Sequence, residues 1–133
     1  MTINYTVSLT EKQCRVLETA LDFYYRIGMG QIERILHVAV PAPGFKPQAD
    51  TVDRDIAMLK MDFLGWSHIG TAHSIGSPEL PDEYRVACDI HDVIRQRLAV
   101  DGLNAGEKGF GVAFDPIWQR GKEPLAKIDR ENT

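Results

Sequence analysis

The stretch from Asp22 to Gln31, DFYYRIGMGQ, places Gly28 and Gly30 one residue apart, directly after an aromatic and basic helix end. Glycine has no Cβ and adopts backbone conformations that other residues avoid, so such a pair ends or kinks a helix. The same geometry can turn backbone N–H groups toward an anion, with Arg26 supplying positive charge from the preceding turn. The chain must change direction here, either as a plain helix cap or as an anion-binding turn.

Helical patterns lie on both sides of these glycines. Residues 10–13 (TEKQ) fit a capping box, which predicts a helix from about residue 11 to residue 27 with Cys14, Leu17, Leu21 and Tyr24 buried. Apolar residues at helical spacing follow over 32–36, and a second helix is expected over 50–64, closed by Gly65. A loop over 65–77 then leads through Ser77 and Pro78 into a long helix over 80–100.

Two short segments near the chain ends alternate between apolar and polar residues. Over 3–9 and again over 110–114, every second residue is apolar, which is typical of strands with one buried face. The expected fold is therefore α+β: a mainly helical single domain over 1–133, with short N- and C-terminal strands paired in a small antiparallel sheet and an extended tail over 116–133. Such a sheet has two open edges, so we expect a homo-oligomer.

Composition narrows the classes of function. Charged residues make up 26% of the 133 residues and the formal net charge is −4, so the chain lacks the basic field that binds nucleic-acid polymers. Residues 1–4 (MTIN) show no basic n-region or apolar h-region, and no apolar run reaches membrane-spanning length, so we expect a cytoplasmic protein with no membrane partner. Cys14 and Cys88 occupy apolar helical positions, as free structural thiols do.

The long helix carries polar residues beside its apolar stripe. Ala87, Ile90, Ile94 and Leu98 form the expected core face, while Tyr84, Cys88, His91 and Arg95 recur along its margin. Asp89 is expected to pair with Arg85. His91 is either a hydrogen-bonded structural residue or a ligand contact, and Arg95 requires a carboxylate of the protein or an anionic ligand.

The sequence thus gives one set of candidate ligand-binding residues, drawn from the glycine turn, the 65–77 loop and the long helix. The set consists of Tyr25, Arg26, Gly28, Gly30, Gln31, His73, His91 and Arg95. For Arg26 the alternative is a solvated helix-end pair with Asp22, worth about 0.3–0.5 kcal/mol. The histidine spacing fits no usual metal site, and Cys88 with His91 makes no nucleophile pair, so we expect no metal, cofactor or catalytic residue.

Four segments carry a resemblance to a known group of proteins: LTEKQ at residues 9–13, DFYYRIGMGQIERI at 22–35, ACDIHDVIRQ at 87–96 and EPLAKI at 123–128. In this order they resemble a widespread family of small proteins of tailed phages and prophages to which no activity is assigned. The resemblance implies a phage protein acting in the host cytoplasm. Relatives often carry a bulky aromatic residue where Cys88 and His91 stand here.

Two classes of function follow. The first is a non-catalytic protein that sequesters an anionic nucleotide second messenger of host antiviral defence, an analogy with other small phage proteins that act as such sponges. Its physical support is the arginines, the glycines, and aromatic residues able to stack on bases. The alternative is an interaction protein that binds a host or phage protein. An enzyme that hydrolyses the same nucleotide class is the third candidate.

Overall fold

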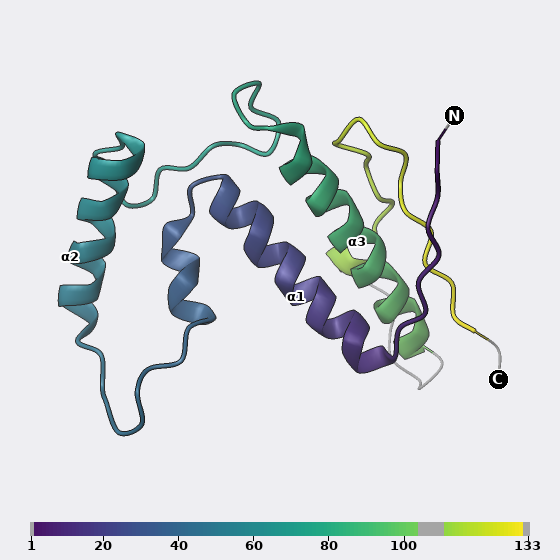
Figure 1. Ribbon diagram of the computed structural model, residues 1–133, viewed down its shortest axis with the longest axis horizontal. Coiled ribbons are helices and arrows are strands. Elements are labelled where there is room, and N and C mark those ends of the chain that lie inside the picture. The colour runs from purple at the N-terminus through teal and green to yellow at the C-terminus, as the bar shows by residue number, and fades with distance from the viewer. Residues whose placement is uncertain (1, 104–110, 132–133) are drawn as a thin grey trace.

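The computed structural model describes residues 2–103 and 111–131, and its body is a pair of helices. α1 (Glu11–Gly28) and α3 (Asp82–Leu103) run side by side in opposite directions (Figure 1). Between them in sequence come the 3₁₀ helix η1 (Ile32–His37), α2 (Ala49–Leu59) and its π-helical continuation η2 (Lys60–Leu64). These three elements lie to one side of the helix pair, and we call residues 32–64 the arm. The short 3₁₀ helix η3 (Val112–Phe114) follows α3.

The predicted helix ends are largely confirmed. In the capping box of α1, the Thr10 hydroxyl accepts from the Gln13 amide at 3.2 Å and Gln13 Oε1 accepts from the Thr10 amide at 2.8 Å. The π-helical turn ends at Gly65, whose φ of 77° is the left-handed conformation that glycine adopts readily. α3 begins at Asp82, slightly later than expected, because residues 77–80 form a separate turn closed by the Leu80 amide and the Ser77 carbonyl.

The core between α1 and α3 agrees with the prediction in part: Ala87 and Ile94 of α3 are buried as expected, whereas α1 buries Tyr25 in place of Tyr24. Tyr25, Ala87 and Cys88 are buried against each other, whereas Tyr24 is 46% exposed and lies on the Tyr84 ring. His91 is also buried. Cys88 and His91, which were predicted to lie at the margin of α3, are therefore buried together with the expected core residue Ala87.

The predicted antiparallel sheet is wrong. The described residues contain no β-strand, and the chain over 3–9 is extended without ladder partners. Residues 112–114 form η3, in which the Phe114 and Asp115 amides donate to Gly111 and Val112 within the same turn. Phe110 lies outside the described residues. The N-terminal and C-terminal segments do pass close to each other (Figure 1), and a 3.4 Å hydrogen bond joins the Ser8 hydroxyl to Glu131.

The C-terminal segment is held on α3 by carboxylates. Asp89 is 3% exposed and accepts hydrogen bonds from the backbone amides of Arg120 and Gly121 at 2.8–3.0 Å. At the N-terminal end of α3, Asp82 accepts a hydrogen bond from the Lys122 amide at 3.1 Å. The expected Asp89–Arg85 pair is therefore not formed: Arg85 pairs with Asp82 and donates to backbone carbonyls of the 65–77 loop.

The arm is fixed to the rest of the chain by a buried lysine. Lys60 is fully buried, its ammonium lies 3.1 Å from Glu33 of η1, and it also donates to the Ile69 carbonyl. The same ammonium lies 5.7 Å from the centroid of the Trp66 ring. A charge out of water must be paired, so these contacts set the position of α2 relative to η1 and the loop. Among the described helices, none is long and apolar enough to cross a membrane.

Candidate anion-binding site

The two glycines of the turn serve close packing in this structure. A Cβ added to Gly28 would lie 2.3 Å from the Tyr84 ring, and one added to Gly30 would lie 2.2 Å from the Trp66 ring. Gly30 is buried and has a φ of 94°, which other residues rarely adopt. The aromatic rings thus occupy the space that a ligand would need at these glycines.

Arg26 and Gln31 lie together around Asp22. The Arg26 Nε donates to Asp22 Oδ1 at 2.8 Å, and its Nη1 lies 3.3 Å from the Gln31 amide oxygen. Arg34 of η1 donates to the other oxygen of Asp22 at 3.0 Å. The Tyr25 hydroxyl also donates to Asp22, at 3.1 Å. One half-buried carboxylate therefore gathers three donors, and Arg26 is mainly occupied within the chain.

His91 connects this cluster to a second carboxylate across the α1–α3 interface. Its Nε2 lies 3.8 Å from Glu18 and 4.0 Å from Asp22, while its Nδ1 lies 3.0 Å from Asp92. The ring meets Tyr25 edge to face at 5.7 Å between centroids. The structure thus brings Tyr25, Arg26, Gln31, His91 and Arg95 into one polar network, with His91 at its buried centre.

His73 lies against the end of α1, and Cys88 is buried between α1 and α3. The His73 amide donates to the Met29 carbonyl at 2.8 Å and its ring packs on Trp66, so His73 fixes the 65–77 loop against the end of α1. Burial raises the pKa of the Cys88 thiol to about 11, which keeps it protonated and a poor nucleophile. The described residues contain no group of His, Cys, Asp and Glu side chains arranged to hold a metal ion.

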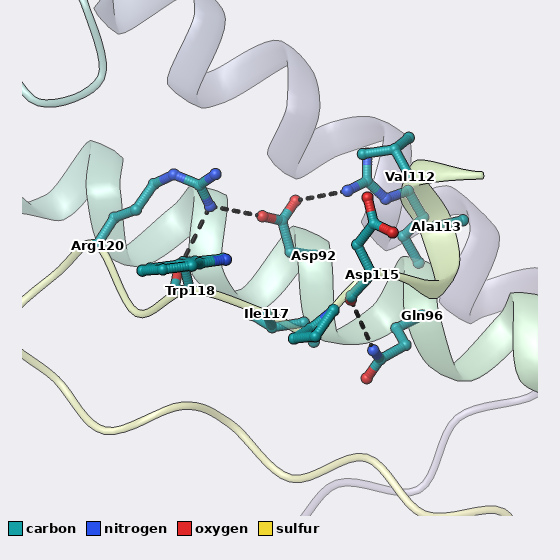
Figure 2. A pocket seen from close by; sticks show the side chains of 10 residues that line it. Asp92, Gln96, Val112, Ala113, Asp115, Ile117, Trp118 and Arg120 are labelled. Atoms are coloured by element: carbon teal, nitrogen blue, oxygen red, sulfur yellow. Dashed lines mark hydrogen bonds and ion pairs between the residues drawn. The ribbon is translucent and has the colours of Figure 1, made fainter. Parts of the chain in front are cut away.

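A small pocket lies beside Asp92 of α3. It measures about 180 Å³ and lies between α3 and residues 112–120 (Figure 2). Its polar lining includes Asp92, Arg95, Gln96, Asp115 and Arg120, with the indole of Trp118 at its edge. Ligand pockets for drug-sized molecules are typically about 300–1,000 Å³, so this pocket suits a single phosphate or carboxylate group.

Two arginines share one carboxylate in this pocket. Arg120 Nη1 donates to Asp92 Oδ2 at 2.8 Å, and Arg95 Nη2 lies 3.5 Å from Asp92 Oδ1 (Figure 2). That same Oδ1 also faces His91. The Nε of Arg95 is buried and has no hydrogen-bond partner among the described residues. The lining thus holds two guanidinium groups and two carboxylates, Asp92 and Asp115, and it leaves Arg95 Nε without an acceptor that the oxygen of an additional anion could supply.

Both carboxylates of the network are held in the charged form. Although burial raises the pKa of Asp92, the hydrogen bond with His91 and the charges of Arg95 and Arg120 lower it below its usual value overall. Burial likewise raises the pKa of Asp22, but its bonds with Arg26, Arg34 and Tyr25 lower it overall. At neutral pH both groups therefore act as anions that orient the arginines around them.

The sequence reasoning found Arg95 but missed the other residues of this pocket. Asp92 and Asp89 lie three residues apart on α3, and Asp82 precedes Asp89 by seven, so one helical stripe of acids could have been recognised as a dock for another segment. Arg120 and Trp118 gave no such signal, because only the folding of residues 115–122 onto α3 brings them there.

Comparisons with known proteins found no matching family model, no matching curated protein and no matching solved structure.

Proposed function

We propose that this protein binds an anionic nucleotide without turning it over, with a phosphate group of the ligand between Arg95 and Arg120. The observation that carries the proposal is the pair of guanidinium groups that share Asp92 in the lining of the 180 Å³ pocket. Arginine offers several N–H donors in a plane and matches phosphate oxygens in a bidentate geometry.

Trp118 supports a nucleotide over a simple inorganic anion. Its side chain is 77% exposed at the edge of the pocket, next to Arg120 (Figure 2). A phosphate group fills the pocket, so the base of a nucleotide would stay outside it, where the indole offers a stacking surface worth about 1–3 kcal/mol. The class of nucleotide proposed, a cyclic second messenger of antiviral defence, rests on the resemblance to small phage proteins and on analogy.

Calorimetric titration with a panel of nucleotides tests the proposal. The panel contains cyclic di- and trinucleotides, cyclic ADP-ribose forms and inorganic phosphate. Arg95→Ala and Arg120→Ala should each weaken binding by about ten- to a hundredfold, because each removes a charge-assisted contact. Arg97→Ala is the matched control: it is on the same helix, and its Nε pairs with Asp101 at 3.0 Å, outside the pocket.

The Arg26→Ala variant distinguishes nucleotide binding in the pocket from binding at the glycine turn, where the sequence predicted the site. Arg26 is bound to Asp22 and Gln31, so its replacement should lower stability and leave nucleotide affinity within about twofold. If Arg26→Ala abolishes binding while Arg95→Ala and Arg120→Ala bind normally, the pocket is the wrong site. If no member of the panel binds, the nucleotide proposal fails. If a ligand binds and is recovered in cleaved form, the protein is a hydrolase and not a non-catalytic binder.

A protein-binding role is the second candidate, and one specific observation favours it. Large apolar side chains are exposed along the arm, as monomeric soluble proteins rarely show in one segment.

A further inference from the structure

His91 does not line the pocket, but it contacts Asp92, which does. Its side chain is 7% exposed, and its Nδ1 lies 3.0 Å from Asp92 Oδ1. Its Nε2 lies 3.8 Å from Glu18 Oε1 and 4.0 Å from Asp22 Oδ1, both on α1. The ring of Tyr25 packs edge to face on the imidazole at 5.7 Å between centroids. Both ring nitrogens and one side of the ring are thus in contact with the protein, and a rotation of the imidazole would break these contacts.

The hydrogen bond between His91 and Asp92 has a defined direction. An ionised carboxylate has no proton to donate, so its oxygens only accept hydrogen bonds. Asp92 is charged at neutral pH, and its side chain is 11% exposed. His91 Nδ1 is therefore the donor and Asp92 Oδ1 the acceptor. Such a bond to a charged group is stronger than one between neutral groups, and here it joins two side chains that are mostly out of water.

The orientation of the Asp92 carboxylate decides where the two arginines of the pocket lie. The oxygen that faces His91 also lies 3.5 Å from Arg95 Nη2, and the other oxygen accepts from Arg120 Nη1 at 2.8 Å (Figure 2). The torsion that turns an aspartate carboxylate is broad, so a neighbour must fix it. The side chains of Arg95 and Arg120 are 31% and 36% exposed, against 7% for His91. The histidine is therefore the most firmly held of the three partners.

We infer that His91 is a positioning residue of the anion pocket: it donates to Asp92 and thereby fixes the carboxylate that sets the directions of the Arg95 and Arg120 guanidinium groups. His91 acts through Asp92 and does not touch the anion. Arginines that are not fixed in advance must be ordered when the ligand binds, which lowers affinity. The effect on affinity rests on the proposed function, whereas the effect on the arginines exists without any ligand.

Two substitutions of His91 separate its Nδ1 contact from the rest of the ring. The amide nitrogen of His91→Asn takes the position of Nδ1 and donates to Asp92, whereas that of His91→Gln reaches the position of Nε2. Both variants are titrated calorimetrically with inorganic phosphate and the nucleotide panel. His91→Gln should weaken binding by at least about fivefold, and His91→Asn should stay within about twofold of the wild type. Glu18→Gln is the matched control, because it changes only the Nε2 side, and it should bind like the wild type.

A second measurement follows Arg120 without a ligand. While its guanidinium group is bound to Asp92, rotation about the Nε–Cζ bond is slowed, and side-chain nitrogen NMR resolves the two Nη groups. Arg120→Lys assigns these signals. His91→Gln should speed the rotation until the two signals merge, and His91→Asn should keep the wild-type spectrum. In the wild type, the Nδ1 proton of His91 should itself give a signal protected from exchange with water.

The inference is overturned if the Arg120 signals of His91→Gln match those of the wild type. It is also overturned if His91→Asn and His91→Gln change these signals equally, with equal losses of stability in urea, because His91 would then only pack between the helices. If neither variant folds, the wild-type spectrum decides, and the absence of a protected Nδ1 proton rules the role out. If the wild type binds no anion while His91→Gln releases Arg120, the nucleotide proposal fails and the positioning role stands.

Discussion

At the scale of single residues, the two glycines of the turn are needed for two different physical reasons, close packing and backbone conformation. Gly28 and Gly30 stand where two aromatic rings, Tyr84 and Trp66, approach the backbone. Only Gly30 also needs its positive φ. Gly28 has ordinary helical geometry at the end of α1, so its lack of a Cβ matters for packing alone.

Gly28→Ala should lower the free energy of unfolding by about 1–3 kcal/mol, because the new methyl group overlaps the Tyr84 ring. Helix propensity by itself predicts the opposite sign, a gain of up to about 1 kcal/mol. Urea unfolding of the wild type and of Gly28→Ala decides between these two expected signs. Gly76→Ala is the control, since a Cβ there meets nothing within 4 Å, and it should stay within about 0.5 kcal/mol of the wild type. A stabilised Gly28→Ala variant would show that α1 and α3 are further apart at this point.

At the scale of elements, α3 supports both of its neighbours. One face packs on α1 through Ala87, Cys88 and His91, and the acidic stripe holds the C-terminal segment. Gly121 belongs to this contact, because a Cβ there would lie 2.8 Å from the Val86 side chain. The pocket between Asp92 and Arg120 exists only while that segment is docked.

Asp89→Asn should release the C-terminal segment from α3. The amide side chain loses the negative charge and one of the acceptors for the Arg120 and Gly121 amides, at a cost of about 1.5–3 kcal/mol. Hydrogen exchange at these two amides should speed up by at least about tenfold, while amides within α1 stay protected. Asp101→Asn, which affects an ion pair with Arg97 at the end of α3, is the control. Unchanged exchange at Arg120 and Gly121 would mean that Asp89 does not hold the segment.

At the scale of the whole molecule, ion pairs and hydrogen bonds replace much of the apolar core. The described core is small, and buried polar residues such as Lys60, Asp89 and His91 lie at the contacts between segments. Such a fold depends on the charge state of its carboxylates.

Stability should therefore fall in acid. Asp22, Asp82 and Asp92 have pKa values lowered in the folded chain: Asp82 chiefly by the Lys122 amide, and the other two by cationic neighbours that outweigh the effect of burial. As the pH falls below about 5, the unfolded chain takes up protons at these groups before the folded chain does. Their stabilisation is complete near neutral pH, declines around pH 4 and is lost below the folded pKa values.

Urea midpoints measured between pH 3 and pH 7 check this dependence. Asp92→Asn should lower the midpoint at pH 7 and reduce its loss between pH 5 and pH 3, since one of the titrating groups is gone. Asp55→Asn, at an exposed position on α2, should follow the wild-type curve. A wild-type midpoint that is unchanged down to pH 3 would contradict the role assigned to the carboxylates.

The sequence by itself determined the local elements of this protein. The capping box at Thr10, the helix break at Gly28 to Gly30 and the stop at Gly65 depend on backbone hydrogen bonds and conformational freedom within a few residues, and each is confirmed. The tertiary structure alone decided the rest. Alternating residues near the ends predicted strands, but the amides of Phe114 and Asp115 are satisfied within η3 and no ladder forms among residues 2–103 and 111–131. Arg120, Trp118 and Asp92 meet only because a distant segment binds the acidic stripe of α3, a contact that no local period encodes.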